Sequence, residues 1–493
     1  MTQVAAVLLA QDPADMEQQA RAALGNGADL VELRLDTIGD LEPTTIRSLA
    51  YSVGSRAIAT LRSSGQGGVS EGAPARRASL LDEIASHPFA YVDLELETDR
   101  TNLESLVRRA SRQRSKTIVS HHFPAAVDTA RIAETIDACL AFGDVAKVAA
   151  PVATFDAAAQ LVDFARARRD RMSLVLIGMG AAGTVTRALA ESTGQEIQYA
   201  SWGRAAVPGQ IPLAAAARLR GREPILLGLV GHPLEHSLSP AIHDAASAAL
   251  GLPSVYLPFD VPPGSLDRFM AAADRLRVRG FNVTIPYKEP VAKSVDELDA
   301  DAESLGAVNT VLLKDGWTKG HNTDVHGFRA TLRSLNLRVG GRDTLVVGAG
   351  GAAKAVVHVL LQEGARVHVT NRSPARADTL ADTFNEPVDV IPTASLPQSG
   401  PWDLLVNATP VGTKGFAGGL PVPESVIAKA SFVYDLGYNP AVTPLLQAAN
   451  RLNRPGTSGL DMLLHQAAKS FELWTGRAAP MDAMRRAAKE ALG

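Results

Sequence analysis

The 493-residue chain is poor in several features, and each scarcity narrows what the protein can be. Its one cysteine, Cys139, excludes an intramolecular disulfide framework and a cysteine-based zinc site, and it suits a reducing compartment. No apolar run reaches the ~18 residues that a membrane span requires. The formal net charge is only −3, so the overall charge favours neither nucleic acid nor an anionic membrane as a partner.

The composition that remains is that of an ordinary globular protein, with 46% hydrophobic and 20% charged residues. A chain of this length is expected to form two or three domains. The apolar run at residues 4–10 lacks a preceding basic segment and a small-residue cleavage site. It therefore predicts a first strand instead of a signal peptide, and a cytoplasmic protein.

The first 220 residues alternate short strand-like runs with amphipathic helical patterns. The strand-like runs are residues 4–10, 29–35, 56–61, 90–96, 116–121, 144–150, 173–178 and 197–202. Eight strand–helix units predict a (β/α)8 barrel over residues 1–220. In such a barrel the active residues lie at the C-terminal ends of the strands.

Charged and polar residues gather at those strand ends. In the run DLVELRLD, period-two alternation puts Glu32, Arg34 and Asp36 on one face of the strand. The other candidates at strand ends are Arg62, His121, His122, Lys147, Arg187 and Gln210. They are either structural ion pairs that fill a barrel or a site for an anionic, hydroxylated small molecule, and their number at successive strand ends favours the site.

Lys147 is the most informative of these residues because it lies inside the apolar run DVAKVAA. Burying an ammonium group costs several kcal/mol unless the charge is paired or the group becomes neutral. Lys147 therefore either faces solvent or is needed as an amine.

The motifs ELRLD, TLR, SHH, DVAKVA, GMGAAGTVTR and PGQ follow one another as in type I 3-dehydroquinate dehydratases, which the first half resembles. The resemblance implies that Lys147 forms a Schiff base with the substrate ketone, which acidifies the adjacent C–H bond. It implies that His122 removes that proton and later protonates the leaving hydroxyl. The substrate-binding residues that it implies are Arg62 and Arg187 for the carboxylate or ring hydroxyls, and Glu32, Arg34 and Gln210 for ring orientation.

Two positions depart from that family's pattern. Gln66 stands where the family usually has a glutamate near the catalytic histidine, and Ala206 stands where a serine usually precedes PGQ. The neutral amide of Gln66 is expected to weaken the tuning of the histidine. The SHHF segment offers both His121 and His122, and the family's spacing selects His122.

A second architecture begins near Gly221. The segment from 226 to 246 predicts a strand, a loop with Ser237 and Ser239, and a helix, an arrangement that suits a carboxylate at the helix N-terminus. Plain helix capping by these serines is the alternative. Lys288 and Asp324 follow later strand-like runs, where they are either a proton donor with its orienting partner or a surface ion pair.

A glycine-rich strand–loop–helix pattern spans residues 343–360 and is typical of dinucleotide binding. The following strand ends in NRSPAR, where an NAD-binding unit would have an acidic residue, and the arginines there favour the 2′-phosphate of NADP. The candidate NADP-binding residues are Gly348, Ala349, Gly350, Gly351, Ala352, Asn371, Arg372, Arg376, Thr409 and Gly459.

The motifs HSLSP, NVTIPYK, GAVNT, NTD, GAGGAAKA, NRSPARA, NATPVG, YDLGYNP and GLDMLLHQA closely resemble shikimate dehydrogenase over residues 225–493. The resemblance implies Lys288 and Asp324 as the catalytic pair. Around the substrate it implies Ser237, Ser239, Thr284, Asn309, Tyr438 and Gln466. It also implies a substrate-binding domain over 221–335 with a C-terminal helix at 460–493, and a Rossmann NADP-binding domain over 336–459.

Together the two resemblances predict a bifunctional enzyme of the shikimate pathway that uses no metal. Its partners would be the small molecules 3-dehydroquinate, 3-dehydroshikimate and shikimate. A quinate dehydrogenase of catabolism is one alternative, and Arg372 and Arg376 argue against it because they favour NADP. A non-catalytic quinate or shikimate sensor is the other, and such a protein should have lost Lys147, Lys288 and Asp324, all of which are present.

Overall fold

The computed structural model describes residues 1–69, 73–97, 99–169, 171–203, 206–234, 237–416 and 418–492. Contacts divide the chain into two compact units. The first comprises Met1–Leu226, Gly251–Leu257 and Gly264–Val278, and the second comprises Leu227–Leu250, Pro258–Pro263 and Arg279–Gly493. The three predicted domains, with boundaries at 220 and 335, stay a prediction. Within the described ranges, no helix is both long and apolar enough to cross a membrane.

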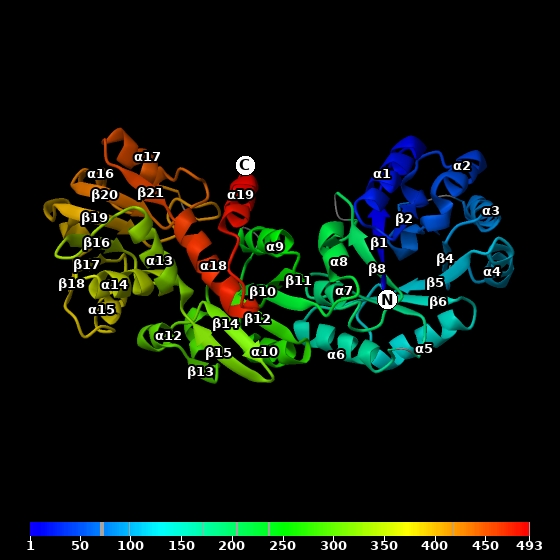
Figure 1. The fold of residues 1–493 in the computed structure, drawn as a ribbon, viewed down its shortest axis with the longest axis horizontal. Helices are drawn as coiled ribbons and strands as arrows, with labels where there is room; N and C mark the ends of the chain where they lie inside the picture. Colours follow the sequence, from blue (N-terminus) through cyan, green and yellow to red (C-terminus); the bar gives the residue numbers. More distant parts are fainter. Residues whose placement is uncertain are drawn as a thin grey trace. The chain divides into compact units, whose positions relative to one another are not determined.

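The first unit is built on parallel strands in the order β7-β6-β5-β4-β3-β2-β1-β8-β9. Their bounds are β1 Gln3–Leu8, β2 Leu30–Arg34, β3 Ala57–Thr60, β4 Tyr91–Glu95, β5 Lys116–His122, β6 Val145–Pro151, β7 Leu174–Met179, β8 Ile197–Ser201 and β9 Ile211–Pro212. The intervening helices are α1 Pro13–Gly25, α2 Pro43–Val53, α3 Pro74–Ala85, α4 Leu103–Arg112, α5 Thr129–Leu140, α6 Phe155–Arg166, α7 Thr184–Ala188 and α8 Leu213–Leu219. All eight predicted strands are present, and Figure 1 shows α1 to α4 on the outside of their strands.

The sheet curls until its two ends meet. The backbone N–H of Glu196, just before β8, donates to the carbonyl oxygen of Leu174 in β7 at 3.0 Å. One continuous core lies inside, and every one of the eight strands contributes to it: Ala5, Val7, Leu30, Ile58, Tyr91, Ile118, Val145, Ala149, Val175, Ile177, Ile197 and Tyr199. The predicted (β/α)8 barrel is therefore confirmed, with a packed interior in place of a pore.

The second architecture begins with a mixed six-stranded sheet in the order β11-β10-β12-β14-β15-β13. Its strands are β10 Ile225–Gly231, β11 Ser254–Asp260, β12 Val278–Val283, β13 Glu297–Leu298, β14 Thr310–Lys314 and β15 Trp317–His321. The helices of this segment are α9 Ser239–Ala249, α10 Leu266–Arg275, α11 Lys288–Ala292, α12 Ala300–Leu305 and α13 Thr323–Ser334.

A parallel sheet follows in the order β18-β17-β16-β19-β20-β21. Its strands are β16 Asp343–Val347, β17 Arg366–Thr370, β18 Val388–Val390, β19 Trp402–Asn407, β20 Ala430–Asp435 and β21 Gly456–Ser458. Its helices are α14 Gly351–Gln362, α15 Pro374–Ala381, α16 Glu424–Ile427 and α17 Pro444–Arg451, and the chain ends with α18 Leu460–Thr475 and α19 Met481–Leu492. Val346 packs into the core on one face, and Leu345 and Val347 pack into the core on the other. Helices cover both faces, as in a Rossmann fold.

Helices α13 and α18 pack side by side and lie between the mixed sheet and the parallel sheet in Figure 1. The Cα of Gly327 in α13 lies so close to α18 that an added Cβ would stand 2.7 Å from the backbone oxygen of Met462. This close packing brings the start of α13, which carries Asp324, near Gln466 of α18.

Candidate active sites

The mouth of the barrel is lined by polar side chains that continue the interior face of each strand. On β2, Leu30 belongs to the interior core, and every second residue after it points the same way. The same alternation runs from Tyr91, Ile118 and Val145. It places these residues on the interior face: Glu32, Arg34, Asp93, Glu95, Ser120, His122 and Lys147.

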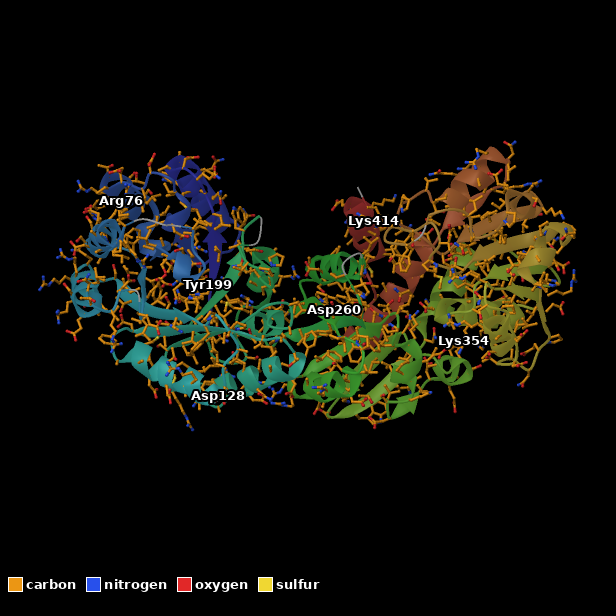
Figure 2. The ribbon with its side chains drawn as sticks, turned by 180° about the vertical axis from the view of Figure 1, so that it is seen from behind. Arg76, Asp128, Tyr199, Asp260, Lys354 and Lys414 are labelled. Carbon is orange, nitrogen blue, oxygen red and sulfur yellow. The ribbon has the colours of Figure 1, made fainter. Side chains whose placement is uncertain are left out.

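Lys147 does not face solvent, because its side chain is only 5% exposed. Its Nζ lies 3.0 Å from Glu32 Oε1 and 3.0 Å from Asp93 Oδ2. The ring of Tyr199, which Figure 2 labels among the barrel strands, lies under the same nitrogen at 4.0 Å from the ring centroid. Two carboxylates and an aromatic face hold a cation at this point.

Arg62 is bound within the same cluster. Its guanidinium donates to Asp93 Oδ2 at 2.8 Å, to Ser120 Oγ at 2.8 Å and to Glu95 Oε1 at 3.3 Å. Burial opposes the charge on Arg62, but Asp93 and Glu95 outweigh it and raise the pKa of the guanidinium. Its hydrogen-bonding capacity is thus largely used inside the protein.

Asp93 and Glu95 of β4 were not among the residues selected from the sequence. The signal was present, because YVDLE alternates as DLVELRLD does and puts both acids on the face of Tyr91. Burial alone would raise the pKa of the Asp93 carboxyl, but Arg62 and Lys147 hold it below its usual range. Asp93 therefore remains ionised although its side chain is fully buried.

Arg187 differs from Arg62 because no carboxylate of the described residues pairs with it. It donates to the carbonyl oxygens of Gly178 at 2.9 Å and Gly209 at 3.2 Å. Burial lowers its pKa to about 10. A buried guanidinium with only carbonyl partners suits an anionic ligand.

Two further predicted residues are held by local contacts. Arg34 donates through Nε and Nη2 to the two oxygens of Asp36, both at 2.8 Å. Gln210 accepts from the backbone N–H of Ala206 at 2.8 Å, which ties together the two ends of the segment that contains PGQ.

The two adjacent histidines point to opposite sides of β5. His122 continues the interior face of Ser120, while His121 stacks edge-on against Phe123 with ring centroids 4.4 Å apart. Burial, with the nearby charges of Arg62 and Lys147, lowers the pKa of His122 well below its usual value. The imidazole of His122 is therefore neutral at neutral pH and able to accept a proton.

Gln66 contacts His122 through the backbone. Its Oε1 accepts from the His122 N–H at 2.7 Å. In the described part of the chain, His122 Nδ1 and the Tyr199 hydroxyl are buried without a hydrogen-bond partner. Such atoms at the mouth of the barrel are available to a bound molecule.

In the second unit, Lys288 and Asp324 form a tight pair. Nζ of Lys288, the first residue of α11, donates to Asp324 Oδ2 at 2.5 Å, and the two side chains are 19% and 10% exposed. Asn309 donates through Nδ2 to the other carboxylate oxygen at 2.9 Å and to Gln466 Oε1 at 3.3 Å. Four predicted residues from α11, α13, α18 and the segment before β14 thus meet in one site.

A buried polar network behind this site was missing from the sequence prediction. Thr323 donates its backbone N–H to Asn309 Oδ1 at 2.7 Å. Ser470 Oγ lies 2.8 Å from Thr310 Oγ1 and accepts from Asn282 Nδ2 at 2.9 Å. Because these residues are isolated hydroxyls and amides in the sequence, only their convergence in space reveals that they hold Asn309 in one orientation.

The loops that carry Ser237, Ser239 and Thr284 lie against each other. Ser237 Oγ accepts from the backbone N–H of Ser239, the first residue of α9, at 3.2 Å. Thr284 donates its N–H to Val230 at the end of β10, and a Cβ on Gly231 would stand 2.4 Å from Thr284 Cγ2. His236 of the HSLSP motif lies outside the described residues.

Tyr438 follows the C-terminal end of β20 in the Rossmann sheet. It is partly buried after β20, and burial raises the pKa of its hydroxyl. The neighbouring Gly437 carbonyl accepts from the N–H of Gly459 at 3.1 Å. A Cβ at Gly459 would stand 2.1 Å from the Leu436 oxygen, so only glycine fits where α18 begins.

The glycine-rich loop fits a dinucleotide phosphate. Gly348 has a φ of +118°, and a Cβ there would stand 3.0 Å from Thr409 Cγ2. A Cβ at Gly350 would meet nothing within 4 Å, which leaves room above the N-terminus of α14. The backbone N–H of Lys354 makes the first helical bond, to Gly350, so the amides of the preceding turn, from Gly351 and Ala352 on, are available to a phosphate.

The glycine-rich loop also adjoins the Lys288–Asp324 pair. A Cβ at Gly351 would approach Lys288 Cδ to 3.2 Å. Ala349 and Ala352 were also predicted to bind the cofactor. Ala349 lies on this loop, and Ala352 lies in the first turn of α14. A group bound to this loop is thus adjacent to the catalytic candidates.

Arg372 and Arg376 are exposed at the end of β17 and in α15, and neither forms an ion pair with another described residue. Asn371 donates Nδ2 to the Ser373 oxygen at 3.0 Å and so shapes the turn that carries Arg372. Thr409 donates its N–H and its hydroxyl to Asn407 Oδ1, at 3.0 Å and 2.7 Å.

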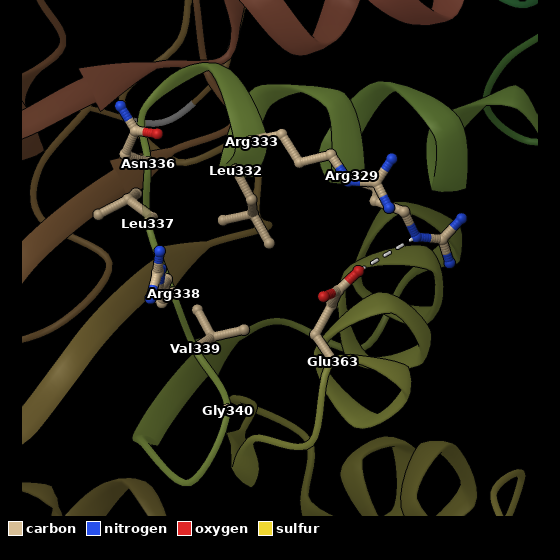
Figure 3. Close-up of a pocket in the computed structure, with 9 residues that line it drawn as sticks. All are labelled: Arg329, Leu332, Arg333, Asn336, Leu337, Arg338, Val339, Gly340 and Glu363. Atoms are coloured by element: carbon tan, nitrogen blue, oxygen red, sulfur yellow. Dashed lines mark ion pairs between the residues drawn. The ribbon is translucent and has the colours of Figure 1, made fainter.

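A separate pocket of about 280 Å³ lies at the end of α13 (Figure 3). Its lining includes Arg329, Leu332, Arg333, Arg338, Val339 and Glu363, and none of the predicted site residues. Arg329 Nε lies 3.5 Å from Glu363 Oε1, the pair marked in Figure 3. Arg333 is in the last turn of α13, where a cation stabilises the helix dipole, so this arginine has an ordinary structural role.

Comparisons with known proteins agree with this division of sites. The family "Type I 3-dehydroquinase" matches residues 4–220. "Shikimate dehydrogenase substrate binding domain" matches 229–311, "Shikimate / quinate 5-dehydrogenase" matches 332–410, and "Shikimate 5'-dehydrogenase C-terminal domain" matches 459–489.

Individual relatives cover the second half. The NADP(+) shikimate dehydrogenase of Methanopyrus kandleri is 44% identical over 280 residues, which are 54% of this chain and 96% of that protein. The Thermus thermophilus shikimate 5-dehydrogenase solved with NADP(H) and shikimate is 37% identical, with a TM-score of 0.50 over 54% of this chain and 100% of its own. A quinate dehydrogenase from Corynebacterium glutamicum solved with NAD is 34% identical, with a TM-score of 0.51 over 54% and 100%. The chain therefore belongs to the shikimate dehydrogenase family and carries, in its first half, a type I 3-dehydroquinase domain.

Proposed function

We propose that the chain catalyses two consecutive reactions, dehydration of 3-dehydroquinate to 3-dehydroshikimate and reduction of that product to shikimate with NADPH. The observation that carries the proposal is a pair of lysines, Lys147 buried and Lys288 partly buried, each paired with carboxylate in its own unit. Lys147 lies 3.0 Å from Glu32 and Asp93, and Lys288 lies 2.5 Å from Asp324. Each reaction supplies a use for the lysine in that chemical setting.

In the barrel, the amine form of Lys147 attacks the ketone of 3-dehydroquinate, and loss of the ketone oxygen as water leaves an iminium, which draws electrons from the adjacent carbon. His122, neutral because its pKa is low, takes the proton from that carbon and returns it to the departing hydroxyl. The substrate carboxylate is assigned to Arg187, because Arg62 is already bound by Asp93 and Glu95. Glu32, Arg34 and Gln210 orient the ring.

In the second unit, Lys288 and Asp324 move a proton at the carbonyl oxygen of 3-dehydroshikimate. Asn309 holds the carboxylate of Asp324 in place. The loop serines Ser237 and Ser239, with Thr284, Tyr438 and Gln466, bind the carboxylate and hydroxyls of the ring. NADPH, when bound, supplies the hydride. We assign its pyrophosphate to the loop from Gly348 to Ala352, and its 2′-phosphate to Asn371, Arg372 and Arg376, with Thr409 and Gly459 shaping the rest of the site.

The test is a coupled assay of the purified full-length chain. We expect 3-dehydroquinate to cause oxidation of NADPH and to yield shikimate. Consumption of 3-dehydroquinate without NADPH oxidation would remove the second activity from the proposal. NADPH oxidation with supplied 3-dehydroshikimate, but no consumption of 3-dehydroquinate, would remove the first. Shikimate and quinate, offered separately with NADP⁺ or NAD⁺, distinguish this enzyme from a quinate dehydrogenase. A sensor without catalysis would turn over neither.

Cofactor choice gives a direct prediction. Replacing both Arg372 and Arg376 by glutamine removes two charge-assisted bonds to the 2′-phosphate, each worth about 1.5–3 kcal/mol. The preference for NADPH over NADH, measured as a ratio of kcat/KM values, should fall at least about tenfold. The double variant Arg333→Gln, Arg338→Gln removes two exposed arginines from the distant pocket and should leave the ratio unchanged. An unchanged ratio in the Arg372, Arg376 variant would place the phosphate elsewhere.

Gln66 gives a prediction about pH. Gln66→Glu keeps an acceptor for the His122 N–H, now 2.7 Å away, and adds a negative charge. The charge stabilises the imidazolium and raises the pKa of His122, so the base form is lost at higher pH. The acid limb of the dehydratase pH–rate profile should move up by about 1 unit. Gln113→Glu, which adds the same charge at an exposed helix end, serves as the control. If the acid limbs of the two variants lie at the same pH, position 66 does not act on the histidine.

We further propose that both reactions take place in the cytoplasm and involve only small molecules. The single cysteine, Cys139, is buried and unpaired, as suits a reducing compartment.

A further inference from the structure

We infer that Asp93 is the counter-ion of the iminium on Lys147, and that it holds this charge from the free enzyme to the covalent intermediate. The inference rests on the proposed Schiff-base dehydration and assigns a role to a residue outside the predicted site. Its basis is a charge count around one nitrogen atom.

Schiff-base formation leaves the charge at Nζ unchanged. The Lys147 ammonium and the substrate ketone become an iminium and water: the C=O bond breaks, the C=N bond forms, and two N–H protons leave with the oxygen. One positive charge is present before and after. The group that balances the ammonium is therefore correctly placed for the iminium, with no rearrangement of the site.

Asp93 meets the requirements for that group better than its neighbours. Its Oδ2 lies 3.0 Å from Lys147 Nζ and 2.8 Å from Arg62 Nη2, and its Oδ1 accepts from Ser120 Oγ at 2.6 Å. These contacts fix both oxygens, and Arg62 keeps the carboxylate ionised. Among the described residues, Glu32, the other acceptor of Lys147, is contacted only through Oε1, by Lys147 and by Thr60, both at 3.0 Å.

Glu95 provides an internal comparison. It lies two residues along β4 and pairs with Arg62 at 3.3 Å, but it contacts Ser63 and Arg77 and not Lys147. A general role in holding Arg62 would be shared by Asp93 and Glu95, whereas of these two acids only Asp93 contacts Lys147 and can act as the counter-ion. The other groups that face Lys147 are Glu32, Arg62, His122 and the ring of Tyr199.

The test uses Asp93→Asn, which keeps the shape and can still accept from Lys147 and Arg62, in the full-length chain. The iminium is titrated by trapping with cyanoborohydride at a series of pH values and saturating substrate, with the reduced adduct quantified by intact mass. Without its anion the iminium should lose its proton sooner, so the alkaline fall in trapping should move down by at least about 1 pH unit. The dehydratase kcat should fall about 10- to 100-fold.

Glu95→Gln is the matched control. Its trapping midpoint should equal that of the wild type, because Glu95 contacts Arg62, Arg77 and Ser63 and not Lys147. A midpoint in Asp93→Asn that equals both would overturn the counter-ion role, even if kcat falls, because a structural defect lowers the active fraction without moving a titration. Absence of any adduct in the wild type would instead refute the proposed Schiff-base dehydration itself.

Discussion

Lys147→Ala is expected to abolish turnover of 3-dehydroquinate, by at least about 10⁴-fold, because it removes the nucleophile that forms the covalent intermediate. Alanine leaves Glu32 and Asp93 at the mouth of the barrel without the cation they now share at 3.0 Å. Absorbance of the enone product measures the loss. Borohydride with substrate should label the wild-type chain at Lys147 and leave the variant unlabelled.

Two controls accompany this variant. Lys116→Ala removes an exposed lysine at the opposite end of the barrel strands, where its Nζ lies 3.6 Å from Glu196, and should keep the wild-type rate. Reduction of supplied 3-dehydroshikimate should stay nearly normal in Lys147→Ala, because every residue proposed for that site lies in the second unit. Dehydration that survives in Lys147→Ala, or labelling at another lysine, would contradict the assignment.

Lys288→Ala is expected to reduce NADPH oxidation with 3-dehydroshikimate by about 10²–10⁴-fold, the usual effect of losing a positioned proton donor. Asp324 would keep its bond from Asn309 at 2.9 Å but lose its partner at 2.5 Å. Dehydration should continue, so that 3-dehydroshikimate accumulates from 3-dehydroquinate and can be measured in solution.

The matched control is Lys319→Ala, which removes a lysine of β15 that pairs with Glu297 of β13 and not with Asp324. It should leave both activities unchanged. If Lys288→Ala lost dehydration as well, in protein that remains folded by circular dichroism, the two sites would not be independent. If it kept full NADPH oxidation, the proton would come from another group.

The sequence alone predicted the fold class of both halves and proposed chemistry-bearing positions in each, although it missed Asp93 and Glu95. Apolar runs with period two and intervening helical patterns were sufficient for the eight barrel strands, because burial of alternate residues is a local property of each strand. The glycine-rich turn was equally readable, since Gly348 has a backbone conformation that other residues rarely adopt. Lys147 stood out because a charge within an apolar run requires a partner. Lys288 and Asp324 were selected by the resemblance to shikimate dehydrogenase, because their own pattern also fitted a surface ion pair.

The tertiary structure alone decided how those positions are connected. Asp93 is 54 residues from Lys147, and Gln466 is 157 residues from Asn309. It also showed that Arg62 is bound by Asp93 and Glu95 while Arg187 contacts only carbonyl oxygens, a difference that two arginines near strand ends do not reveal in the sequence. The physical reason is that hydrogen bonding and charge pairing depend on distances across strands and helices, whereas the sequence pattern reports only which face of its own element a residue occupies.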